Sequence, residues 1–234
     1  MSDFRVRPSA SGASRAYREA IVSDLAPVRP LMKPSRRVWL LVPIGMMLAA
    51  TAPFLNGIRG DLMSLPYGPL LTWGATGLQS MLGLWLLALG FREAVPGRNV
   101  SGLSLALAAA LTILLVGTIT IVTNAASATV VPAGREWRDW IECVVFPALI
   151  GSPFMVIATL MAARAFPTRP AIAGGLCGLS AGVLSDAGWR LSCWISDPAH
   201  LAESHVLAML SLAAAGSLIA VILDSRHWRR LRTS

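Results

Sequence analysis

Six long apolar stretches separated by short polar joints constrain this chain more than any other feature. The stretches cover residues 38–55, 70–91, 103–122, 143–163, 171–191 and 206–223. The hydrocarbon core of a bilayer is about 30 Å thick, so a helix rising ~1.5 Å per residue needs about 20 apolar residues to cross it. Lipid cannot satisfy backbone amides, and a membrane barrel would show short alternating segments instead. The sequence therefore predicts an all-α bundle of six transmembrane helices.

The basic residues predict the orientation of these helices. Most of the 20 Lys and Arg residues lie before the first stretch, in every second joint and in the tail. The few on the other side are Arg59, Arg135, Arg138 and Arg190. Because positively charged loops stay inside, both termini should be cytoplasmic. This distribution explains the net charge of +8 without a nucleic-acid partner, so we expect no direct nucleic-acid binding.

The same pattern predicts three parts of the chain. Residues 1–37 should form a cytoplasmic N-terminal segment, residues 38–223 the six-helix transmembrane domain, and residues 224–234 a basic cytoplasmic tail. The joints between the apolar stretches are short, so we expect residues 1–37 to be the main part of the chain outside the membrane.

Enzyme motifs give no support for catalysis. Gly178-Leu179-Ser180-Ala181-Gly182 matches the G-x-S-x-G pattern of serine hydrolases, but that motif works on a sharp strand-to-helix turn. Here Gly174, Gly178 and Gly182 recur every four residues within an apolar stretch, a spacing typical of close helix packing. HExxH, P-loop and Rossmann motifs are missing from the sequence. We therefore expect neither an enzyme nor a cofactor.

Two cysteines mark the predicted outer side. Cys143 opens the fourth stretch and Cys193 follows the fifth, where an oxidising compartment would permit a disulfide. Such a bond needs Cα atoms within about 7 Å, which the sequence does not decide. Glu142 should disfavour the thiolate of Cys143, whereas Arg190 should favour that of Cys193. A redox or metal sensor, a structural disulfide and two buried packing residues all stay open.

Other polar residues near this side give weaker predictions. His200 and His205 show no spacing to cysteines or carboxylates that is typical of a metal site. A loose cluster of His200, Glu203, His205 and Asp197 could bind a cation weakly, but a solvated loop is the favoured interpretation. Asp186 and Arg190, four residues apart, should form a local salt bridge near the interface. Trp189 should belong to an interfacial belt of tryptophans.

The N-terminal segment contains one amphipathic pattern. Tyr17, Ile21 and Leu25 repeat every four residues, which predicts a helix over about 14–25. Pro27 and Pro30 should then end it. A single short helix cannot bury its own apolar face, so this one should bind either anionic lipid or a groove on a cytosolic protein.

Three short motifs and one further cysteine stand out by their order and spacing. They are Asp24-Leu25-Ala26-Pro27-Val28-Arg29-Pro30-Leu31, Ala94-Val95-Pro96-Gly97-Arg98, Asp139-Trp140-Ile141-Glu142-Cys143, and Cys193. Together with the six-span layout they resemble the NrsF-type membrane anti-sigma factors, over residues from about 18 to 230. The resemblance implies a bacterial inner-membrane protein whose cytoplasmic N-terminus holds an extracytoplasmic-function sigma factor inactive.

The resemblance also implies where the partner and the signal act. The sigma factor would contact Tyr17, Ile21, Asp24, Leu25, Val28 and Arg29. Redox or heavy-metal stress would be sensed at two outer-side cysteines, which match Cys143 and Cys193. Their surroundings would be Asp139, Trp140, Glu142 and Arg190. One departure is that Cys193-Trp194-Ile195-Ser196-Asp197-Pro198 stands where a Cys-Pro-acidic stretch would be expected.

Two other functions compete with this interpretation. A small transporter or channel would need a polar path through the bundle, and the middles of most stretches are apolar. A membrane thiol oxidoreductase would be expected to carry a Cys-x-x-Cys pair, which the sequence lacks.

Overall fold

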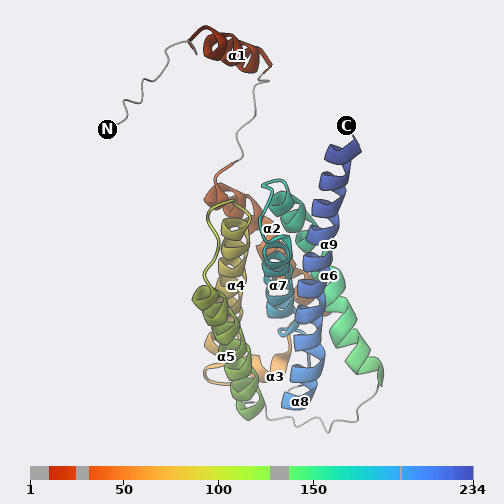
Figure 1. The fold of residues 1–234 in the computed structure, drawn as a ribbon. Helices are drawn as coiled ribbons and strands as arrows, with labels where there is room; N and C mark the ends of the chain where they lie inside the picture. Colours follow the sequence, from red (N-terminus) through yellow and green to blue (C-terminus); the bar gives the residue numbers. More distant parts are fainter. Residues whose placement is uncertain (1–10, 25–31, 127–136, 196, 234) are drawn as a thin grey trace, which may run out of the picture. The chain divides into compact units, whose positions relative to one another are not determined.

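A computed structural model describes residues 11–24, 32–126, 137–195 and 197–233. The regular structure of these residues is entirely helical (Figure 1). The chain divides into two units, Met1–Leu31 and Met32–Ser234. In the described residues of the second unit, six helices are long and apolar enough to cross a membrane. The prediction of an all-α protein with six such helices is confirmed.

The six candidate spans lie close to the predicted stretches. Five are single helices: α2 (Pro34–Asn56), α4 (Gly68–Glu93), α5 (Gly102–Ala126), α6 (Trp137–Ala163) and α7 (Pro170–Trp189). The sixth, Pro198–Arg226, combines the short α8 (Pro198–His200), a π-helical turn η1 (Leu201–His205) and the first part of α9 (Val206–Thr233). A further short helix, α3 (Gly60–Met63), follows α2.

The central element of the second unit is α7. In its apolar window 78% of the residues are buried, against 22% in α2, because α2, α4, α6 and α9 all pack on it. Gly178 permits the closest approach, since a Cβ there would collide with the backbone of Leu212 in α9. Gly174 and Gly182 face α9 in the same way, so the predicted packing role of this glycine stripe is confirmed.

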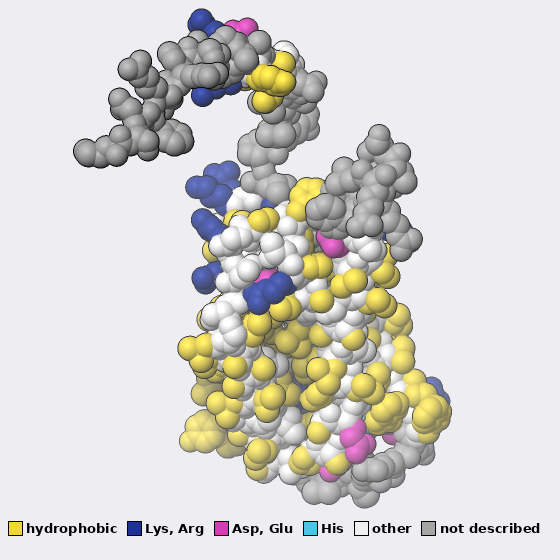
Figure 2. All heavy atoms as spheres, in the orientation of Figure 1, with side chains coloured by type: hydrophobic (Ala, Val, Ile, Leu, Met, Phe, Trp, Pro, Cys, Tyr) yellow, Lys and Arg dark blue, Asp and Glu magenta, His cyan; other side chains and the backbone are white. Residues whose placement is uncertain are grey.

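The face of the bundle drawn in Figure 2 carries apolar side chains over most of its length. Large side chains such as Ile113, Leu114 and Leu149 are at least 60% exposed. An apolar surface of this extent is typical of helices that face lipid. Lys and Arg side chains gather instead at the end of the bundle where α2 begins.

Buried polar contacts tie helices together at that basic end. Arg37, in the first turn of α2, donates hydrogen bonds of 3.0 Å to the carbonyl oxygens of both Met32 and Met161. Arg169, just before α7, pairs with the buried Glu93 of α4 through two contacts of 2.6 Å. Arg37 therefore connects the beginning of α2 with the end of α6. Arg169 connects the beginning of α7 with the end of α4.

The first unit contains α1 (Ser11–Asp24). This helix begins three residues before the predicted start and ends one residue before the predicted end. Tyr17 and Ile21 are 72% and 59% exposed, as expected for an apolar face without an intramolecular partner. Asp24 is the last residue of α1, and Leu25, Val28 and Arg29 lie outside the described residues.

Candidate functional site

Cys143 and Cys193 lie side by side at the end of the bundle opposite the beginnings of α2 and α7. Cys143 is in the second turn of α6, and Cys193 comes four residues after the end of α7. Their Sγ atoms are 3.7 Å apart, so both thiols are free, since a disulfide needs about 2.05 Å. Both side chains are buried in a small apolar cluster with Ala52, Trp189 and Ile150. The structure thus brings together the two residues predicted to act as the sensor.

Two histidines complete this cluster. The Nε2 atom of His200 is 4.0 Å from the Sγ of Cys193. One ligand atom from each of Cys143, Cys193, His200 and His205 lies within 4.8 Å of the others. The expected solvated loop is wrong for His205, which is fully buried, and both histidines lie within ligand distance of the cysteines.

The π-helical turn explains why the sequence did not reveal this arrangement. His200 and His205 are five residues apart, a spacing that separates side chains on an α-helix by about 140°. A π-helical turn closes i→i+5 hydrogen bonds and brings such residues to one side. Here η1 covers Leu201–His205, and the two imidazole rings meet edge to face at 5.9 Å.

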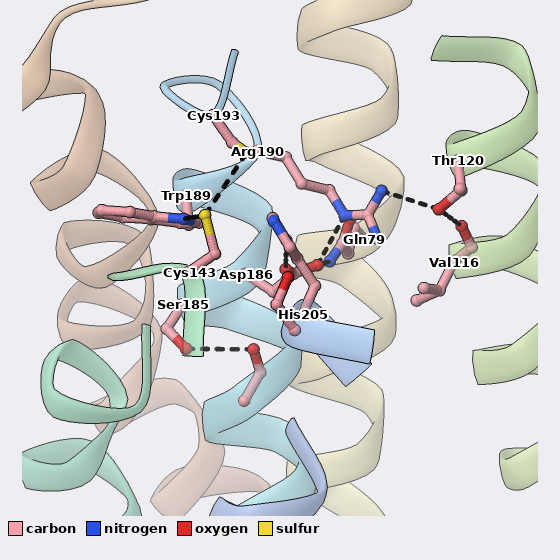
Figure 3. A network of polar contacts seen from close by, with 12 residues as sticks. Gln79, Val116, Thr120, Cys143, Ser185, Asp186, Trp189, Arg190, Cys193 and His205 are labelled. Atoms are coloured by element: carbon pink, nitrogen blue, oxygen red, sulfur yellow. Dashed lines mark hydrogen bonds and ion pairs between the residues drawn. The ribbon is translucent and has the colours of Figure 1, made fainter. Parts of the chain in front are cut away.

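The orientation of His205 is fixed by Asp186 (Figure 3). The Nδ1 atom of His205 is 2.5 Å from a carboxylate oxygen of Asp186. Its Nε2 atom is buried and has no hydrogen-bond partner among the residues that the structure describes. The hydrogen bond at Nδ1 therefore leaves Nε2 as the nitrogen available to the cysteine cluster.

Asp186 is the centre of a buried polar network. It accepts hydrogen bonds from Arg190 Nε at 2.7 Å and from Gln79 Nε2 at 2.6 Å, and Arg190 also donates to Thr120 Oγ1 at 3.1 Å. The predicted Asp186–Arg190 ion pair is present. The pair is more than a local salt bridge, because Asp186 is fully buried and the network connects α7 with α4, α5 and η1.

Two residues that were not predicted to belong to the site, Trp189 and Arg59, also contact the cysteines. Trp189 is 9% exposed and donates from its indole nitrogen to the Sγ of Cys143 at 3.4 Å, so its assignment to an interfacial belt is wrong. Arg59, in the loop between α2 and α3, donates to the carbonyl oxygen of Cys193 at 2.8 Å and pairs with Asp61. Neither contact joins residues that are close in sequence, so no local pattern could reveal them.

The other residues expected around the sensor lie near it with different partners. Asp139 and Trp140 are half-buried in the first turn of α6. Glu142 pairs with Arg138 at 3.0 Å, and Arg190 pairs with Asp186. Glu142 and Arg190, which are close to the two cysteines in sequence, therefore form ion pairs with other residues and not with the thiols.

The two thiols differ in their hydrogen bonding. The pKa of Cys193 is well below its ordinary value, first because Cys143 hydrogen-bonds to its sulfur and also because His200 does so, although burial acts in the opposite direction. Cys193 is therefore the thiol that ionises first. Two thiols and two imidazoles at this separation offer two chemistries, namely a disulfide after a small approach of the sulfurs, or the binding of a soft divalent cation.

Comparison with protein families gives one match. The family model for NrsF, described as negative regulator of sigma F, matches residues 21–223. Comparisons with curated proteins and with solved structures gave no match. The matched range begins within α1 and includes Cys143, Cys193, His200 and His205.

Proposed function

Because the chain belongs to the NrsF family of negative regulators of sigma F, we propose that it is a membrane-bound anti-sigma factor. The family match over residues 21–223 carries this conclusion, and it confirms the resemblance based on short motifs. The proposed partner is a sigma factor of the extracytoplasmic-function class. The proposed location is a bacterial inner membrane, with both termini in the cytoplasm, as the basic residues favour.

The N-terminal segment is the proposed binding site for the sigma factor. Support comes from α1, whose Tyr17 and Ile21 expose a narrow apolar face that needs a partner. The proposed contact residues are Tyr17, Ile21, Asp24, Leu25, Val28 and Arg29.

The cysteine pair is the proposed site of the signal. Its support is the 3.7 Å separation of the two Sγ atoms in an apolar cluster, where oxidation or metal capture would change how α6 and the end of α7 pack. The proposed route of the signal toward the N-terminal segment runs along α6. The same helix α6 carries Cys143 near its beginning and Met161 near its end, and Met161 is bonded to Arg37 in α2.

Affinity purification tests the anti-sigma function. The full chain, tagged at its C-terminus, would be purified in mild detergent from a bacterium that encodes it, and co-purifying proteins identified by mass spectrometry. We expect one sigma factor, lost in Ile21→Asp because a charge enters the apolar face of α1. Ser23→Asp is the matched control, since it adds the same charge on the opposite side of the helix.

The outcomes separate two parts of the proposal. Absence of any sigma factor from the wild-type preparation would overturn the anti-sigma function. Equal recovery with Ile21→Asp and with Ser23→Asp would overturn the role of the α1 face, and would move the contact to another part of the chain.

A further inference from the structure

We propose that Cys143, Cys193, His200 and His205 together bind one divalent cation of the zinc type, such as Zn²⁺ or Cd²⁺, in a tetrahedral site. The inference deepens the proposed sensor and depends on the proposed function only for the cation's role as a signal. The binding itself stands on the geometry of the four side chains.

The sulfur separation fits such a site. Two thiolates bound to zinc at about 2.3 Å with a tetrahedral angle lie about 3.8 Å apart. The Sγ atoms of Cys143 and Cys193 are 3.7 Å apart. All four ligand atoms lie within 4.8 Å of one another, so small side-chain rotations would bring them to a common centre.

The donor set selects the class of cation. Two sulfurs and two imidazole nitrogens suit Zn²⁺ and Cd²⁺, whereas Mg²⁺ and Ca²⁺ prefer oxygen ligands. Each thiol gives up its proton to solvent on binding, so the two negative charges balance the charge of the cation. Three of the four ligands are buried, and His200 is half-buried and gives the site an edge toward the surface.

Supporting contacts already orient the ligands. Metal-bound histidines commonly donate their second ring nitrogen to a carboxylate, which fixes the tautomer and the ring plane. Asp186 contacts Nδ1 of His205 in this way and leaves Nε2 without a partner among the described residues. Trp189 donates to the sulfur of Cys143, and Arg59 holds the backbone of Cys193.

The cation would connect three separate elements. Cys143 belongs to α6, Cys193 to the segment after α7, and His200 and His205 to α8 and η1, which precede α9. These elements pack around α7 at the centre of the bundle. Metal binding would therefore fix the relative positions of α6, α7 and α9 at this end of the bundle.

Cobalt absorption of the purified full chain tests the proposal. Co²⁺ reports both coordination geometry and thiolate ligation, and it occupies zinc sites. We expect one Co²⁺ per reduced chain in detergent, with the strong visible bands of tetrahedral cobalt, a thiolate charge-transfer band and displacement by Zn²⁺ or Cd²⁺. Substituting any ligand by alanine should weaken binding by at least the roughly 10–100-fold that loss of a supporting group causes.

Two variants make the test specific. Cys177→Ala removes the third buried cysteine, which lies in α7 away from the four ligands, and should bind cobalt like the wild type. His200→Ala changes a half-buried residue in a three-residue helix, so it tests ligation with the least risk to folding.

The opposite results would overturn the inference. These are weak octahedral cobalt bands, no cobalt binding by the reduced wild type, or wild-type affinity in both His200→Ala and His205→Ala. The last result would leave a site of two thiols alone. If the chain binds no cobalt but a sigma factor still co-purifies, the anti-sigma function stands and the metal site is overturned. If a tetrahedral cobalt site forms but no sigma factor co-purifies, the metal site stands and the anti-sigma function is overturned.

Discussion

Asp186 contacts three polar side chains inside the bundle. It is fully buried and contacts Gln79, Arg190 and His205 at 2.5 to 2.7 Å. Burying a carboxylate costs free energy unless it is paired and hydrogen-bonded. These three partners therefore stabilise the buried Asp186. Its contact with His205 links the network to the cysteine cluster.

Substitution of Asp186 should therefore weaken metal binding without removing a ligand. Asp186→Asn loses the charge that orients and polarises His205, and we expect the affinity for Co²⁺ to fall by about 10–100-fold with the tetrahedral spectrum retained. Glu142→Gln is the control, because Glu142 adjoins Cys143 but pairs with Arg138. An equal loss in both variants would mean that general negative charge, rather than the orientation of His205, sets the affinity.

The residues of the site differ in how far the sequence could predict them. Cys143 and Cys193 were predictable because each lies at the outer end of an apolar stretch, which sets their depth. His205 was not, because its approach depends on a π-helical turn that hydrophobic periodicity does not indicate. Arg59 reaches Cys193 across 134 residues, a contact that only the packed structure can bring about.

The contact between α7 and α9 depends on glycine. A Cβ at Gly178 would collide with the backbone of Leu212, which cannot move away as a flexible side chain could. We expect Gly178→Ala to destabilise the bundle by about 1–3 kcal/mol, the usual cost of overpacking. The measurement is thermal unfolding of the purified chain in detergent.

Gly117→Ala is the matched control for this prediction. Gly117 lies within α5, and a Cβ there would meet nothing within 4 Å. Alanine should then be neutral or stabilise the protein by about 0.4–1 kcal/mol, because it restricts the unfolded chain. Equal melting temperatures for the two variants would contradict the close packing of α7 on α9.

The helix α6 is one of the helices that reach both ends of the bundle. Arg37 binds the carbonyl oxygens of Met161 in α6 and of Met32, where the second unit begins. We expect Arg37→Leu to keep the sigma factor bound but to reduce the response to metal stress. A reporter gene under control of the sigma factor would measure the ratio of induced to uninduced expression.

The neighbouring arginine supplies the control for this experiment. Arg36 is exposed, so Arg36→Leu removes the same charge one residue away without touching Met161. A wild-type induction ratio in Arg37→Leu, or the same loss in Arg36→Leu, would exclude the Arg37 contact as part of the route.

The elements were more predictable than their contacts. Each of the six spans was visible as an apolar stretch, because length and hydropathy suffice to specify a membrane helix. Hydropathy did not predict that α7 lies at the centre of the bundle, since its mean hydropathy of 1.3 equals that of α4. Its stripe of small residues was the available signal, and it correctly indicated close packing.

For the whole molecule, a signal at the cysteines can act on a cytoplasmic sigma factor only if opposite ends of the bundle are coupled. The cysteine and histidine cluster lies at one end, and the basic end carries the polar contacts of Arg37 and Glu93. The apolar surface between them places lipid around the middle of the bundle. A signal must therefore pass through helices that move as units, of which α6 and α7 touch both ends.

Sigma-factor release from the reconstituted complex tests this coupling most directly. The full chain with its sigma factor bound would be placed in lipid nanodiscs, and the bound fraction measured as Cd²⁺ is added. We expect release from the wild type and from Cys177→Ala, and retention by the Cys143→Ala, Cys193→Ala double variant. Release from the double variant at the wild-type Cd²⁺ concentration, or retention by all three proteins, would exclude coupling from the cysteines to the sigma factor.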